Sequence, residues 1–268
     1  MANINKFIFG NWKMNMTYNQ TESFCKEFNR FVKKDKFLKK TKIQFGVAPT
    51  FLGLLPTRSL LKQPTIVGAQ NASAIEKGAY TSQVSYSQLK EYNIEYAILG
   101  HSEVRQYLGE TDKDINNKAI KLINENMIPI ICIGESLKEY ESKKTIKVLE
   151  KQIIEDTKGI SAKNASKIII AYEPLWAIGT GKTPTTDEIQ SVCTQIRKIL
   201  KTIFKDNAEQ IHILYGGSLK PENAKSILAL KNVDGGLIGG ASMIAKSFFD
   251  IIKSCPEYIQ IEKQNSKK

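Results

Sequence analysis

Long apolar runs are missing from this sequence of 268 residues. None approaches the roughly 18 uncharged apolar residues that a membrane-spanning helix needs. The opening stretch, MANINKFIFG, lacks the basic and apolar regions of a secretory signal. The four cysteines are scattered and form no Cys-x-x-Cys pair, which is typical of a reducing compartment. We therefore expect a cytoplasmic protein with no membrane partner.

Arginine is also scarce. Only four of the 39 basic residues are arginine, although the net charge is +12. Arginine is the residue best suited to bidentate contacts with phosphates and base edges. The densest lysine run, residues 33–40, falls between an amphipathic segment and a strand-like one, where a solvated surface is expected. The sequence therefore predicts no specific nucleic-acid partner, and only weak attraction at low salt.

Cofactor signatures are absent as well. The chain has no Gly-x-Gly-x-x-Gly turn, no Gly-x-x-x-x-Gly-Lys-Ser/Thr loop and no cluster with metal-ligand spacing. We therefore expect chemistry that needs neither a cofactor nor a metal ion.

The sequence does contain eight short apolar runs, rich in β-branched and aromatic residues, that read as strands. They cover Lys6–Phe9, Ile43–Ala48, Thr65–Ala69, Glu95–Leu99, Ile128–Ile133, Lys167–Tyr172, Ile211–Tyr215 and Gly236–Ile238. Amphipathic helical patterns lie between them, most clearly at Thr17–Lys33, Thr111–Asn126, Lys143–Lys158 and Thr186–Phe204. Pro221 is placed to open a further helix.

Eight alternating strand and helix units without a break in composition indicate one α/β domain with a parallel sheet. A doubly wound sheet usually has about five or six strands, whereas a (β/α)8 TIM barrel uses all eight. We therefore predict a single barrel domain over residues 1–260. The short basic C-terminal tail, residues 261–268, is expected to be disordered.

In such a barrel, catalytic groups belong on the loops after the strands. Those loops carry Asn11 and Lys13 after the first strand, His101 and Glu103 after the fourth, and Glu173 after the sixth. Taken singly, the lysine and the carboxylates could be ordinary surface residues. His101 stands out because it lies between a predicted strand and the predicted start of a helix, where a neutral ring able to donate a hydrogen bond is favoured. His212, inside the seventh strand, reads as a core residue.

Two glycine-rich turns follow the seventh and eighth strands: Gly216-Gly217-Ser218 and Gly239-Gly240-Ala241-Ser242. Glycines let backbone N–H groups approach an anion, and barrels often bind phosphate at this position. The glycines could instead serve only to make tight turns. The segment Pro174–Thr183, with Trp176 near its start, suits a mobile lid.

Six motifs in chain order make the sequence resemble the triosephosphate isomerase family: FGNWKMN (9–15), LGHSE (99–103), CIGE (132–135), AYEPLWAIGTGKT (171–183), YGGS (215–218) and GLIGGAS (236–242). The resemblance implies interconversion of dihydroxyacetone phosphate and glyceraldehyde 3-phosphate through an enediolate. It assigns Glu173 as the base, His101 as the electrophile, Lys13 and Asn11 as stabilisers of negative charge, and Glu103 as a supporting neighbour.

The resemblance also implies a substrate-binding set and a lid. Asn11, Lys13, Gly179, Ser218, Gly239 and Gly240 would bind the phosphorylated triose. The lid would comprise Pro174, Leu175, Trp176, Ala177, Ile178, Gly179 and Thr180. Leu175 and Pro184 stand where the family more often has valine and alanine.

A homodimer joined by the loop Gln70–Ser82 is the last implication, with Thr81 reaching the site of the other subunit. Here the sequence departs from the family pattern: Ser82-Gln83 replaces Gly-Glu, and Val104 replaces arginine. Two readings rival the isomerase: a barrel that acts on another sugar phosphate, and a basic barrel that has lost catalysis and binds nucleic acid or surfaces. The intact Glu173, His101 and Lys13 favour the isomerase.

Overall fold

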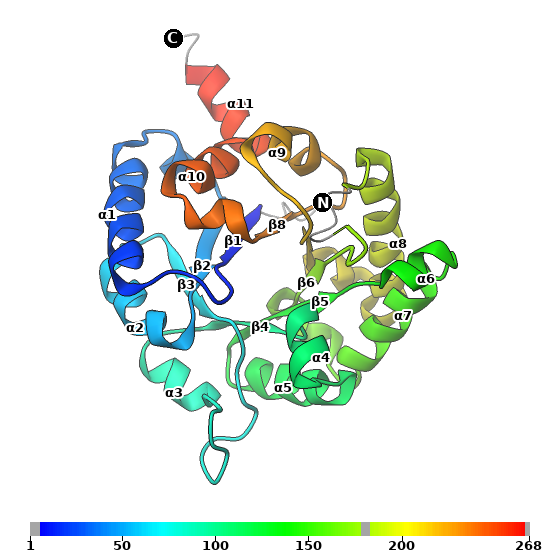
Figure 1. The fold of residues 1–268 in the computed structure, drawn as a ribbon. Coiled ribbons are helices and arrows are strands. Elements are labelled where there is room, and N and C mark those ends of the chain that lie inside the picture. The colour runs from blue at the N-terminus through cyan, green and yellow to red at the C-terminus, as the bar shows by residue number, and fades with distance from the viewer. Residues whose placement is uncertain (1–5, 178–182, 266–268) are drawn as a thin grey trace.

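The computed structural model describes residues 6–177 and 183–265, whose eight strands are all parallel and close into a barrel in chain order (Figure 1). The strands are β1 (Phe7–Asn11), β2 (Gln44–Ala48), β3 (Ile66–Ala69), β4 (Tyr96–Leu99), β5 (Ile128–Ile133), β6 (Ile169–Tyr172), β7 (His212–Tyr215) and β8 (Gly235–Ile238). Pairing of β1 with β8, from Phe7 opposite Gly235 to Gly10 opposite Ile238, closes the barrel. The predicted (β/α)8 fold is confirmed.

Helices surround the barrel (Figure 1). They are α1 (Tyr18–Lys34), α2 (Phe51–Leu60), α3 (Tyr86–Glu91), α4 (Ser102–Leu108), α5 (Asp112–Asn124), α6 (Leu137–Glu141), α7 (Thr145–Asp156), α8 (Thr186–Phe204), α9 (Pro221–Leu228), α10 (Ala245–Lys253) and α11 (Pro256–Asn265), with short 3-10 turns η1 (Leu38–Lys40), η2 (Ala162–Lys167), η3 (Lys205–Gln210) and η4 (Gly240–Met243). The bounds of α8 match those predicted, because a capping box between Thr185 and Glu188 sets its start.

Two apolar layers hold the barrel together. Side chains that point inward fill its interior: Phe7, Phe9, Ala48, Ile98, Ile130, Cys132, Ile169, Ala171, Leu214 and Leu237. A larger layer lies between the strands and the helices. Each strand is therefore covered on both faces, which explains why the strand sequences are apolar at successive positions. This scaffold fixes the carboxyl ends of all eight strands at one end of the barrel, where the predicted site residues gather.

The tail predicted to be disordered is helical as far as Asn265. The helix α11 is anchored by Tyr258, which is 1% exposed and donates a hydrogen bond of 2.7 Å from its hydroxyl to Oδ2 of Asp35. Its ring also packs edge-on against Phe37. The prediction was wrong for residues 261–265 because it weighed local composition, whereas a contact 223 residues away orders the segment. Residues 266–268 lie outside the described part of the chain. Among the described helices, none is long and apolar enough to span a bilayer.

Candidate active site

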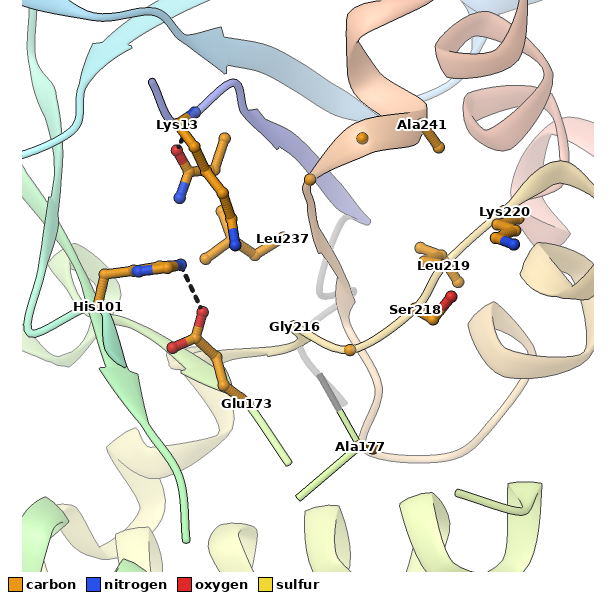
Figure 2. Close-up of a pocket in the computed structure, with 14 residues that line it drawn as sticks. Lys13, His101, Glu173, Ala177, Gly216, Ser218, Leu219, Lys220, Leu237 and Ala241 are labelled. Atoms are coloured by element: carbon orange, nitrogen blue, oxygen red, sulfur yellow. Dashed lines mark hydrogen bonds and ion pairs between the residues drawn. The ribbon is translucent and has the colours of Figure 1, made fainter. Parts of the chain in front are cut away.

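A cavity of about 280 Å³ opens at the carboxyl end of the barrel. Figure 2 shows the predicted charged residues on one side of it and the glycine-rich turns on the other. The residues that line it come from the carboxyl ends of five strands and from the loops after them: Asn11, Lys13, His101, Glu173, Ala177, Gly216, Gly217, Ser218, Leu219, Lys220, Leu237, Gly239, Gly240 and Ala241. The structure therefore brings together the groups that the sequence spreads over 230 positions.

Glu173 and His101 face each other at the base of the cavity (Figure 2). Oε1 of Glu173 lies 2.9 Å from Nε2 of His101, and Oε2 accepts the backbone N–H of Ser102 at 3.2 Å. The two residues are only 3% and 5% exposed. Burial strengthens such a polar contact because water does not screen it. The carboxylate is thus held beside the imidazole by two donors.

The hydrogen bonds of His101 define its tautomer. His101 is the N-cap of α4, and its Nδ1 accepts the backbone N–H of Glu103 at 3.3 Å. A nitrogen that accepts an N–H carries no proton, so this contact places the ring proton on Nε2. That proton points at Glu173. His101 lies at a helix N-terminus, as expected; its neutral state and its role as a donor stay predictions.

Lys13 adopts a left-handed backbone conformation, with φ of 53°. Such a conformation costs free energy in a residue with a side chain, and it persists where surrounding contacts enforce it. Oδ1 of Asn11 accepts the backbone N–H of Lys13 at 3.0 Å, and Nε2 of Gln70 donates to its carbonyl oxygen at 2.8 Å. Nζ of Lys13 forms an ion pair of 2.6 Å with Oε1 of Glu103. The ammonium is thereby aimed at the cavity.

The opposite wall of the cavity is rich in glycine. Gly216 packs so closely that a Cβ atom there would lie 2.9 Å from Cγ of Glu173. Gly240 is open to the cavity, with no described atom within 4 Å of where its Cβ would be. Gly239 caps the turn η4, and Ser218 lines the same wall. This wall has room and backbone N–H groups for an anion. Within the described residues, no group of three or more His, Cys, Asp or Glu side chains is arranged to hold a metal ion.

The structure describes the first part of the predicted lid, as far as Ala177, and the carboxylate of Glu135 holds it in place. Nε1 of Trp176 donates to Oε1 of Glu135 at 2.8 Å, and the hydroxyl of Tyr172 donates to the same oxygen at 3.1 Å. Tyr140 stacks on the indole ring, with ring centroids 4.0 Å apart. Burial raises the pKa of Glu135, and these hydrogen bonds oppose the rise. Ile178, Gly179 and Thr180, also predicted for the lid, lie outside the described residues.

Thr81 does not approach the cavity of its own chain. It lies exposed on the loop between β3 and α3, which projects away from the barrel (Figure 1). In the same loop Ser82 has a left-handed backbone, with φ of 76°. Several large apolar side chains are exposed on this loop and on the segments after the neighbouring strands: Met14, Leu52, Ile75, Tyr80, Tyr107 and Leu108. An exposed apolar surface of this kind typically marks a protein–protein contact.

Some residues that shape the site were not predicted for these roles. Gln70 was expected only in a subunit interface, yet its amide also fixes the carbonyl oxygens of Lys13 and Ala48. Tyr140 and Arg105 carried no local pattern that would single them out. The contacts of Tyr140 with Trp176, and of Arg105 with Cys132 and Asp156, join segments that are distant in sequence, so only the folded chain reveals them. For Glu135 the sequence offered one signal of a role at the site, its place in the CIGE motif.

Comparison with known proteins agrees with this geometry. The family model described as triosephosphate isomerase matches residues 6–255. A triosephosphate isomerase from Mycoplasma capricolum is 45% identical over 248 residues, which is 92% of this chain and 97% of the relative. Those from Mycoplasmoides gallisepticum and Clostridium botulinum (strain Loch Maree) are 42% and 43% identical, over 95% and 91% of this chain and 100% and 97% of theirs. The chain is therefore a member of the triosephosphate isomerase family.

Proposed function

We propose that this enzyme interconverts dihydroxyacetone phosphate and glyceraldehyde 3-phosphate, with Glu173 as the base. The observation that carries the proposal is the buried pair of Glu173 and His101, which lines one cavity together with Lys13 and a glycine-rich wall. Moving a proton between adjacent carbons requires a base, a donor for the oxygen that becomes negative, and a binding site for the phosphate. The cavity holds groups suited to each task.

The proton transfer follows from the contacts of Glu173. In the free enzyme its carboxylate accepts from Nε2 of His101 and from the N–H of Ser102. A substrate carbonyl oxygen would take the His101 proton as its hydrogen-bond donor and release Oε1. The carboxylate then removes the proton from the carbon next to the carbonyl, leaving an enediolate. The hydroxyl proton moves from one enediolate oxygen to the other by way of Nε2 of His101, and the carboxyl of Glu173 returns its proton to the neighbouring carbon, which completes the isomerisation.

His101, Lys13 and Asn11 would stabilise the negative charge. A neutral imidazole with its proton on Nε2 can donate to either oxygen of the enediolate. The ammonium of Lys13, now paired with Glu103, carries a full positive charge beside the cavity. Exchange of that carboxylate for the dianionic substrate keeps the ammonium paired throughout. Glu103 is thus a supporting residue that holds Lys13 until substrate arrives.

The phosphate would lie against the wall formed by Ser218, Gly239 and Gly240. Free space at Gly240 and the approach of Gly239 to Lys13, whose Cε is 3.8 Å from where a Cβ would be, place that wall within reach of the cation. Gly179 is expected to add a further N–H. We assign the segment beginning at Pro174 as a lid that excludes water from the enediolate, because Trp176 is anchored at one edge of the site through Glu135.

A homodimer would complete the site. Thr81 is exposed on a projecting loop in the single chain, and apolar side chains are exposed beside it. In a symmetric pair, the same surface on both subunits packs against itself. Thr81 of the partner subunit would then reach the loop that carries Asn11 and Lys13. Gln83 and Val104 leave this interface with fewer charged side chains than the family pattern has.

The experiment that tests the proposal is turnover of glyceraldehyde 3-phosphate by wild type, Glu173→Gln and the matched surface variant Glu222→Gln. We expect Glu173→Gln to lower kcat by at least about 10²-fold, since it removes the base but keeps the shape. Glu222, in the first turn of α9, should tolerate the change. Equal rates in all three proteins, or no isomerisation by wild type, would overturn the assignment.

A further inference from the structure

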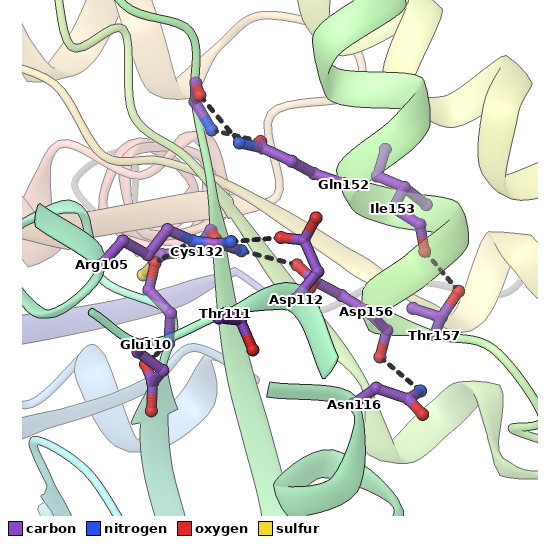
Figure 3. Close-up of polar contacts among 12 residues, drawn as sticks. Arg105, Glu110, Thr111, Asp112, Asn116, Cys132, Gln152, Ile153, Asp156 and Thr157 are labelled. Atoms are coloured by element: carbon purple, nitrogen blue, oxygen red, sulfur yellow. Dashed lines mark hydrogen bonds and ion pairs between the residues drawn. The ribbon is translucent and has the colours of Figure 1, made fainter. Parts of the chain in front are cut away.

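We propose that Arg105 is a positioning residue for His101, acting through the peptide that precedes it. The inference rests on the proposed function, because it gives Arg105 a task only if His101 handles the substrate oxygens. Arg105 lies on α4, outside the substrate cavity, and its guanidinium points toward the ends of β4 and β5 (Figure 3).

Arg105 and Glu110 hold Gly100 from both sides. Nε of Arg105 donates to the carbonyl oxygen of Gly100 at 2.8 Å, and the N–H of Gly100 donates to Oε2 of Glu110 at 2.8 Å. Gly100 has φ of 66°, in the left-handed region that glycine adopts most readily. A Cβ there would lie 2.6 Å from Cδ1 of Ile115. The residue directly before His101 is therefore fixed through both of its polar backbone groups.

The rest of the guanidinium is bound to three other elements (Figure 3). Nη2 donates to the carbonyl oxygen of Cys132 on β5 at 3.2 Å and to Oδ2 of Asp156 on α7 at 2.8 Å. Nη1 donates to Oδ1 of Asp112 at the start of α5. A planar group with five N–H donors can satisfy these directions together, whereas the single ammonium of a lysine cannot. Arg105 thus ties the ends of β4 and β5 to two helices.

The short helix α4 depends on these contacts. All seven of its residues are described, and none of them is buried within the single chain, where polar contacts such as those of Arg105 hold the helix in place. Yet α4 supplies the N–H of Ser102 to Glu173, the N–H of Glu103 to Nδ1 of His101 and the carboxylate of Glu103 to Lys13. A shift of α4 would move all three contacts together. Loss of positioning by about 1 Å is enough to slow catalysis strongly.

Arg197 provides a matched control. It too is a largely buried arginine: Nη1 donates to the carbonyl oxygens of Ala208 and Ile211, and Nη2 to Oδ2 of Asp234. Those groups lie just before β7 and β8, at the end of the barrel opposite the site. Replacing Arg197 should cost stability of the same kind without reaching His101.

The test compares Arg105→Lys with Arg197→Lys and wild type. We expect both variants to lower the melting temperature. Only Arg105→Lys should also lower kcat, by about 10- to 100-fold, with KM near the wild-type value. Nitrogen-15 NMR should show a shifted Nε2 signal of His101 in Arg105→Lys alone. A wild-type kcat and an unshifted His101 signal in folded Arg105→Lys would overturn the proposal.

Two further results distinguish a failure of the proposed function from a failure of the positioning role of Arg105. If wild type itself does not isomerise the substrate, the proposed function fails, while the His101 signal still tests the positioning by Arg105. If Arg105→Lys does not fold, Asp112→Ala takes its place, because the Asp112 side chain is 25% exposed and its loss frees only Nη1. That variant should show the same shift of the His101 signal and a smaller loss of kcat; wild-type values for both would overturn the proposal.

Discussion

Nε2 of His101 lies 2.9 Å from Oε1 of Glu173, so the two side chains that we assign to proton handling are partners of each other in the free enzyme. The contact is buried, and the bond from Glu103 to Nδ1 leaves the ring proton on the nitrogen that faces the carboxylate. The imidazole and the carboxylate thereby serve as each other's hydrogen-bond partner until a substrate oxygen accepts the imidazole N–H in place of Glu173.

Replacing His101 by glutamine should lower kcat by about 10²- to 10³-fold, the usual cost of removing a donor to a developing oxyanion. The chain has one other histidine, His212, which lies at the opposite end of the barrel with its ring 6.3 Å from that of Phe7. His212→Gln should keep wild-type turnover. Steady-state kinetics on both variants decides the matter, and equal losses would contradict the role of His101.

Replacing Gly240 by alanine should raise KM about tenfold, which corresponds to roughly 1.4 kcal/mol of lost binding. The added methyl meets no described atom within 4 Å and occupies the space assigned to the phosphate. The fold should be unaffected, so the melting temperature should stay at the wild-type value. Inhibition by inorganic phosphate is the second measurement. An unchanged KM and unchanged phosphate inhibition would show that the substrate phosphate does not bind at this wall.

Asp156 should make the stability of the enzyme depend on pH. Burial raises the pKa of its carboxyl from 3.8 to about 8, and the Arg105 guanidinium only partly opposes this, while Asp112 and Glu110 add to the rise. Between about pH 4 and pH 8 the folded state therefore holds a proton that the unfolded state has released. The free energy of unfolding consequently falls as the pH rises through this window.

Asp156→Asn removes this titration while keeping the shape of the side chain. Urea unfolding at pH 5, 7 and 9 should show wild type losing stability relative to Asp156→Asn as the pH rises. The change cannot exceed about 1.4 kcal/mol per pH unit for a single group. If the difference in free energy of unfolding between wild type and Asp156→Asn is the same at all three pH values, the carboxyl of Asp156 is ionised throughout.

Replacing Leu52 by glutamate should break the proposed dimer. Leu52 is 92% exposed in the single chain and lies on α2, after β2, beside the projecting loop. We expect sedimentation velocity to show a monomer at micromolar concentration, with turnover reduced about tenfold or more because Thr81 of the partner subunit no longer completes the site. Ile154→Glu, on the far side of the barrel and 44% exposed, is the control. A dimeric Leu52→Glu variant would place the interface elsewhere.

The barrel could be predicted from the sequence because each strand is a short β-branched run buried on both faces. All eight predicted runs agree with the observed strands within two residues at either end. Helix α8 was predicted with its observed bounds because its apolar spacing and the acidic residues Asp187 and Glu188 near its start are local signals. Pro221 likewise opens α9.

Long-range contacts set the limit of that prediction. The hydrogen bond from Tyr258 to Asp35 orders α11, and no local sequence pattern near Tyr258 predicts this contact. The same holds for Gln70, which secures the strained backbone of Lys13 from another loop. The residues that we assign to substrate binding carry recognisable motifs, whereas supporting residues such as Gln70 and Tyr140 are defined by the fold.

None of the residues of α4, all of which are described, is buried within the single chain, which affects how a monomeric form such as the Leu52→Glu variant loses activity on heating. Segments with little apolar packing open locally at a lower free energy than the surrounding core. The amide hydrogens of α4 should therefore exchange with deuterium earlier than those of β4, whose last three residues are buried. Activity should then be lost at a temperature where the circular dichroism of the barrel is still unchanged, since His101 disengages while the strands remain paired.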